Sequence, residues 1–138
     1  MGILGTQLTL VKYLTKKNLI RYDGDVTDAS HVDLADYCPR YEHAMSLLGK
    51  RWTGLILRAL LSGETRFSAI CSYVPGLSDR LLSERLKELE SEGIVQRHVY
   101  ADTPVRVEYT LTPRGEELRP VVEALQVWAD RWVPLETQ

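Results

Sequence analysis

The chain has 138 residues, of which 44% are apolar, enough for one domain with its own hydrophobic core. Its 17 basic and 19 acidic side chains give a formal net charge of -2, so charge alone does not indicate a nucleic-acid partner. No apolar run reaches the ~18 residues of a membrane span, and the N-terminus lacks the pattern of a secretory signal. We therefore expect a cytoplasmic protein with no membrane partner.

The first 37 residues differ in pattern from the rest of the chain. Residues 1–22 carry a weak helical spacing of apolar side chains. Residues 23–37 are acidic, and Asp23-Gly24-Asp25 is a turn signal. The sequence therefore predicts an N-terminal extension and linker over residues 1–37, followed by a single domain over residues 38–138.

Four helical patterns open that domain. They cover residues 41–48, 52–60, 67–74 and 78–92, and the turn signal Pro75-Gly76 separates the last two. Ser78 is a suitable N-cap for the fourth helix, and Gly93 is a suitable stop. Two strand patterns follow at residues 95–101 and 105–111. Helix, turn, helix and a two-stranded ribbon are typical of a winged helix-turn-helix, which places one helix in a DNA groove.

The C-terminal part of the domain predicts one more helix. It begins near Thr112-Pro113, and Pro120 is expected to kink or restart it. Its apolar stripe consists of Leu118, Val121, Val122, Leu125, Trp128 and Trp132. The predicted fold class is thus mainly α with a small β-ribbon, a winged helix-turn-helix with extra N- and C-terminal helices for dimerisation.

The helix over residues 78–92 has the two faces that a DNA-recognition helix needs. Three leucines fall on one side of a helical wheel, and polar side chains fall on the other. Arg106 on the ribbon and the pair before Trp52 are candidates for contacts with the DNA backbone or minor groove. Arg85 lies near the boundary of the two faces, where it reaches either a phosphate or a neighbouring acid. The predicted DNA-binding residues are Lys50, Arg51, Ser78, Arg80, Ser83, Arg85, Lys87 and Arg106.

An ordinary solvated surface would also carry such polar side chains. The competing class is a winged-helix protein-interaction module that does not bind DNA, and the acidic net charge is its best support. The sequence contains no phosphate-binding glycine loop and no catalytic triad or elbow, so we expect neither an enzyme nor a cofactor.

Several short motifs occur in a fixed order along residues 38–133. They are Cys38-Pro39, Leu48-Gly49-Lys50 with Trp52, Leu57-Arg58-Ala59-Leu60, Arg66-Phe67, Pro75-Gly76-Leu77-Ser78, Arg85-Leu86, Glu92-Gly93, Arg106-Val107-Glu108-Tyr109, Leu111-Thr112 and Gly115. Through these motifs the chain resembles the HxlR family of bacterial transcription regulators, winged-helix proteins related in fold to the MarR group. The resemblance implies a homodimer that is built through the terminal helices and binds a two-fold symmetric, double-stranded DNA operator.

The sequence departs from this family in two places. Gly49-Lys50-Arg51-Trp52 contains an extra basic residue, and the 37 residues before Cys38 exceed the usual short lead. The long lead would cover the partner subunit or an effector pocket beside the dimer helices.

Cys38 is the candidate sensing residue. The resemblance implies that the cysteine at this position senses electrophiles or oxidants in some family members. Locally, Arg40 and a nearby helix start favour a reactive thiolate, although packing at a dimer interface is the other interpretation. Cys71 is expected to be a half-buried, inert thiol.

A metal site is not expected. The spacing of Cys38, His43 and Cys71 matches no compact ligand motif, and His98 is expected to be a surface residue. A small-molecule or metal-responsive regulator without cysteine sensing remains the alternative.

Overall fold

The computed structural model describes residues 34–136. The helical pattern expected in residues 1–22 and most of the expected linker lie outside the described residues. The chain divides into two units, Met1–Pro39 and Arg40–Gln138, and the fold below is that of the second unit.

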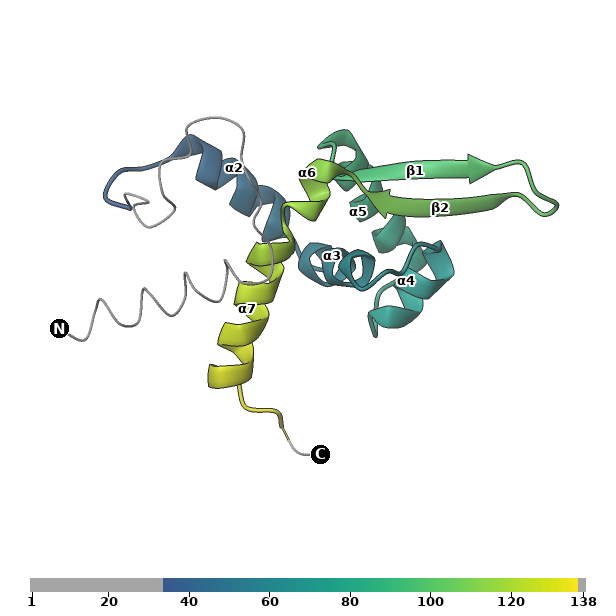
Figure 1. The fold of residues 1–138 in the computed structure, drawn as a ribbon. Helices are drawn as coiled ribbons and strands as arrows, with labels where there is room; N and C mark the ends of the chain where they lie inside the picture. The colour runs from purple at the N-terminus through teal and green to yellow at the C-terminus, as the bar shows by residue number, and fades with distance from the viewer. Residues whose placement is uncertain (1–33, 137–138) are drawn as a thin grey trace. The chain divides into compact units, whose positions relative to one another are not determined.

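The order of the elements is that of a winged helix-turn-helix (Figure 1). With the labels of Figure 1, they are α2 (Pro39–Leu48), α3 (Thr53–Leu61), α4 (Phe67–Tyr73), α5 (Asp79–Ser91), β1 (Val95–Tyr100), β2 (Arg106–Leu111), α6 (Pro113–Glu116) and α7 (Arg119–Trp132). All four predicted helices and both predicted strands are therefore confirmed, with bounds that differ by one or two residues. Among residues 34–136, no helix combines the length and the apolar character needed to cross a membrane.

Local signals in the sequence set the ends of several helices. The Ser78 hydroxyl accepts a hydrogen bond from the Leu81 amide at 3.2 Å, which confirms Ser78 as the N-cap of α5. Thr112 caps α6 in the same way through the Gly115 amide at 3.1 Å. Pro120 stands in the first turn of α7, where its missing N–H is tolerated, so it restarts the helix as predicted.

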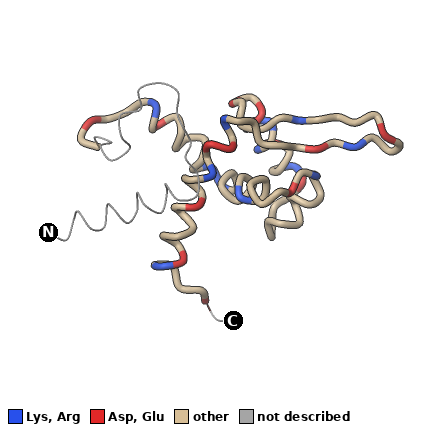
Figure 2. Tube along the Cα trace, viewed as in Figure 1, with Lys and Arg blue, Asp and Glu red and all other residues tan. Residues whose placement is uncertain are grey.

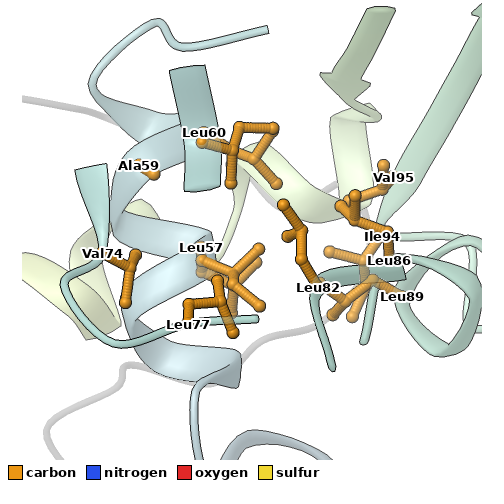
Figure 3. Packing of buried hydrophobic residues seen from close by; sticks show 12 residues of the cluster. Leu57, Ala59, Leu60, Val74, Leu77, Leu82, Leu86, Leu89, Ile94 and Val95 are labelled. Atoms are coloured by element: carbon orange, nitrogen blue, oxygen red, sulfur yellow. The ribbon is translucent and has the colours of Figure 1, made fainter. Parts of the chain in front are cut away.

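The core lies between α3, α4 and α5 (Figure 3). The predicted apolar face of α5 is confirmed, because Leu82, Leu86 and Leu89 are at most 1% exposed. They share the core with Ile56, Leu57, Ala59, Leu60, Ile70, Val74, Leu77, Ile94 and Val95. Burial of this set fixes α5 by its leucine side, which leaves the opposite side of the helix available for other contacts.

The two strands form an antiparallel ribbon, the wing of the fold. Val95 pairs with Leu111 at its base, and Tyr100 pairs with Arg106 near its tip. The Tyr109 amide donates a hydrogen bond to the Thr65 carbonyl at 2.8 Å, so the loop between α3 and α4 holds the base of β2. Every residue of β2 is half-buried, so the two faces of the strand differ less than its alternating sequence predicts.

Candidate DNA-binding surface

The outward side of α5 carries the predicted recognition residues. The Arg80 side chain is 89% exposed, and its Nε lies 3.3 Å from Glu84 Oε1, one helical turn away. Lys87 is also exposed, whereas Ser83 is half-buried. Ser78 is exposed and caps the helix, so its hydroxyl already serves the backbone. Arg80 and Lys87 are therefore the two side chains of α5 that are best placed to meet a DNA groove.

The turn between α2 and α3 brings two further bases beside α5. Lys50 Nζ lies 3.1 Å from Glu88 Oε1, and the Arg51 guanidinium lies 4.6 Å from the centre of the Trp52 ring. Trp52 adopts a left-handed backbone with φ of 81°, which is uncommon for a residue other than glycine. Its ring faces Gly76, where an added Cβ would lie 3.5 Å from the ring edge. The indole thus ties this turn to the turn before α5.

Arg85 points inward. Its side chain is only 17% exposed, with Nη1 3.3 Å from Glu88 Oε1. Its Nε donates a hydrogen bond to the Arg51 carbonyl at 3.1 Å. Of the two destinations predicted for Arg85, a phosphate or a neighbouring acid, the structure shows the acid. Glu88 was not predicted as this acid, although its spacing of three residues from Arg85 is a signal for a helical ion pair.

On the wing, Arg106 is held by two acids and a ring. Its Nε donates to Asp102 Oδ2 at 2.9 Å, its Nη1 donates to Glu108 Oε1 at 2.8 Å, and its guanidinium lies 4.2 Å from the Tyr100 ring centre. The hydrogen bond to Asp102 is the main cause that raises the pKa of Arg106 above its ordinary value. Figure 2 shows the same mixture of charges, because basic and acidic positions alternate along the outer ribbon. Any partner that meets the Arg106 guanidinium therefore also meets two carboxylates.

The two cysteines lie in different surroundings. Cys38 is exposed and directly precedes the first residue of α2. Cys71 is half-buried, as predicted, and its thiol lies 3.3 Å from both the Leu77 carbonyl and Asp79 Oδ1. Burial raises the pKa of Cys71, and the neighbouring Asp79 carboxylate raises it further. Both effects favour the thiol of Cys71 over its thiolate, and the thiol is the less reactive form.

Two further expectations concern His98 and a metal site. His98 is half-buried on β1, where its ring nitrogen lies 2.7 Å from the Thr110 hydroxyl. Within the described range, no three His, Cys, Asp or Glu side chains lie close enough to share a metal ion.

A hollow of about 250 Å³ is lined by Arg58, Leu61, Ser62, Tyr73, Arg119, Val122, Glu123 and Gln126. It lies against α7, and the N-terminal side of the predicted effector pocket lies outside the described residues.

Comparison with known protein families shows which family the chain belongs to. The family described as HxlR-like helix-turn-helix matches residues 47–137. The chain belongs to the HxlR family. The predicted family and the predicted winged-helix fold are therefore both confirmed, and the protein is a transcription regulator of the HxlR type.

Named relatives agree with this assignment. YvaP of Bacillus subtilis, an uncharacterized HTH-type transcriptional regulator, is 50% identical over 99 residues, which are 72% of this chain and 92% of YvaP. The HTH-type transcriptional regulator YodB of the same organism is 50% identical over 95 residues, 69% of this chain and 85% of YodB.

Solved structures agree as well. Reduced YodB matches with a TM-score of 0.63 and 49% identity over 71% of this chain and 96% of that chain. YodB has also been solved in a diamide-treated and in a quinone-bound form. The oxidized form of the redox regulator HypR matches with a TM-score of 0.66 and 34% identity, over 71% of this chain and all of that chain.

Proposed function

We propose that this HxlR-family regulator binds a two-fold symmetric operator as a homodimer, with α5 of each subunit in the major groove. The carrying observation is that α5 buries Leu82, Leu86 and Leu89 while Arg80 and Lys87 stay exposed. The two half-sites would lie ~34 Å apart, one turn of the duplex, and each wing would contact the flanking backbone or minor groove. Lys50 and Arg51 would contact phosphates beside α5.

The face of α7 supports the dimer. Four large apolar side chains of its predicted stripe are 53–66% exposed in the single chain, namely Val121, Leu125, Trp128 and Trp132. A contiguous apolar face of this kind is typical of an interface. A second copy of the chain is the simplest occupant, because a two-fold axis would bury the same stripe on both subunits.

Salt dependence tests the proposed function against the protein-interaction alternative, which the net charge of -2 favours. The probe is the DNA duplex that the wild-type protein selects from a random-sequence pool. Binding through phosphate contacts releases counterions, so the affinity for this duplex should fall steeply as salt rises. A protein that selects no duplex, or that binds with no salt dependence, would favour the interaction module.

Arg80→Ala is expected to weaken binding to the selected duplex by about 1–3 kcal/mol, or about 5- to 150-fold. The reason is that Arg80 is the exposed arginine of the first turn of α5, where a bidentate contact with a base edge is possible. Fluorescence anisotropy with the selected and a scrambled duplex measures the effect. Arg80→Lys is the matched control, because it keeps the charge and loses the fork-shaped donor. An unchanged affinity of Arg80→Ala for the selected duplex would remove Arg80 from the readout.

We further propose that Cys38 is the sensing residue. Cys38 is exposed, whereas Cys71 is half-buried in surroundings that favour its less reactive thiol form. The quinone-bound and diamide-treated forms of YodB support electrophiles and oxidants as the effector class. With a quinone, the Cys38 sulfur would add to a ring carbon and lose its proton, and the ring would become a hydroquinone thioether.

Cys38→Ser is expected to keep DNA binding in the presence of a quinone, under conditions in which the wild type releases the selected duplex. The serine hydroxyl is not ionised near neutral pH and does not add to the quinone ring. Anisotropy before and after treatment measures release, and mass spectrometry locates the adduct. Cys71→Ser is the matched control and should respond like the wild type. Equal release by wild type and Cys38→Ser would show that Cys38 is not the switch.

A further inference from the structure

We propose that Glu108 and Asp102 are positioning residues that hold the Arg106 guanidinium ready for contact with DNA. This inference rests on the proposed function, in which Arg106 on the wing touches the duplex. Acidic side chains beside DNA phosphates ordinarily weaken binding through repulsion. For sequence-specific binding, the geometry points to the opposite effect. The two acids here strengthen the affinity for DNA, because they orient the guanidinium of Arg106.

Three contacts restrict the orientation of the Arg106 guanidinium. Hydrogen bonds from Nε to Asp102 and from Nη1 to Glu108, at 2.9 and 2.8 Å, set the rotation of the group within its own plane. The Tyr100 ring, 4.2 Å from its carbon, sets the tilt of that plane. Neither hydrogen bond uses Nη2, so the donors of that nitrogen remain for a third partner.

Glu108 is the firmer of the two acids. Its side chain is 18% exposed, against 55% for Asp102. Its backbone is held on both sides, because it pairs with His98 of β1 and forms an isolated bridge with Arg66 of the loop before α4. The base of the wing, and through it the helical core, thus determines where Arg106 points.

Stability alone does not explain this arrangement. Ion pairs on a surface contribute little to folding because solvent screens them and the side chains lose freedom. Arg106 is 37% and Asp102 55% exposed, so their pair belongs to this class, and the pair with Glu108, which is 18% exposed, is screened on the arginine side. A free arginine on the wing would instead sample many rotamers, and binding would have to order it. When the guanidinium is already ordered in the free protein, binding loses less side-chain entropy. The two acids therefore raise the affinity for DNA rather than the stability of the fold.

The experiment is a double-mutant cycle on the intact protein, with the duplex that the wild type selects from a random pool and a scrambled duplex. Glu108→Ala is expected to weaken binding to the selected duplex about 5- to 50-fold and to leave binding to the scrambled duplex unchanged or stronger. In the Arg106→Ala background the same change should not weaken binding further. Asp102→Ala, at the exposed tip, should act in the same direction with a smaller effect. Thermal unfolding verifies that each variant is folded.

The outcomes separate this inference from the proposed function. Stronger binding of Glu108→Ala to the selected duplex would mean that the acid only repels DNA, and would overturn the inference. Equal losses with and without Arg106 would mean that Glu108 supports the wing structurally, and would overturn it too, as would an Arg106→Ala variant with wild-type affinity. A wild-type protein that selects no duplex would instead overturn the proposed function, and the inference with it.

Discussion

A Leu125→Asp variant is expected to be a monomer and to lose ~10²–10⁴-fold in affinity for the selected duplex. Leu125 is 65% exposed in the single chain and lies in the middle of the apolar stripe of α7. In a two-fold dimer the variant would place two unpaired carboxylates in an apolar interface, which costs several kcal/mol. Loss of the dimer also removes the gain from binding two half-sites at once. Light scattering after gel filtration measures the mass, and anisotropy measures the affinity.

Val127→Asp is the matched control for this variant. Val127 is 38% exposed on the same helix, and at ~100° per residue it lies on the other side of α7 from the stripe. It introduces the same charge into the same helix, so any general effect on α7 would appear in both variants. We expect Val127→Asp to remain dimeric. A dimeric Leu125→Asp variant at the same protein concentration would exclude the stripe of α7 as the interface.

The fold was predictable because its signals are local. The leucines of α5 repeat at helical spacing, and Ser78 and Thr112 accept hydrogen bonds from amides three residues ahead. Pro120 restarts α7 because a helix interior does not accept proline. Each of these features acts within about one helical turn, so the order of the residues is sufficient to reveal it.

The candidate site was predictable only in part, because its side chains pair across the fold. The direction of Arg85 depends on the Arg51 carbonyl, 34 positions away in the chain. His43 likewise lies 3.1 Å from Glu92, 49 positions away. A helical wheel places such residues on a face but does not identify the partner that another helix brings to them. The exposure of Arg80 and Lys87 was easier to predict, because it follows from their place on the side of α5 opposite the leucines.

The backbone of Trp52 shows a second limit of sequence reasoning. Its φ of 81° is a conformation that large side chains rarely adopt, and no propensity predicts it. The ring is half-buried against the core, and this contact holds the backbone where it is. The position of Lys50 and Arg51 beside α5 follows from this turn, so packing rather than local preference places them.

Leu57→Ala is expected to lower the free energy of unfolding by about 2–5 kcal/mol. Leu57 is 1% exposed on α3 and belongs to the core that fixes α5. The substitution loses the burial of the removed carbons and leaves a cavity that close-packed neighbours fill only in part. Urea unfolding at one protein concentration measures the change, with the slope of the transition unchanged if the variant still unfolds as one unit.

Leu55→Ala is the matched control, because it makes the same change on the same helix where the side chain is 47% exposed. Both variants gain the same small amount of helix propensity, so the difference between them isolates burial. We expect Leu55→Ala to cost much less than Leu57→Ala. Because α3 carries the core against which α5 rests, loss of Leu57 should weaken binding to the selected duplex only at urea concentrations or temperatures at which the fold itself begins to open. Weaker binding by a fully folded Leu57→Ala variant would contradict this separation of the core from the DNA-binding surface.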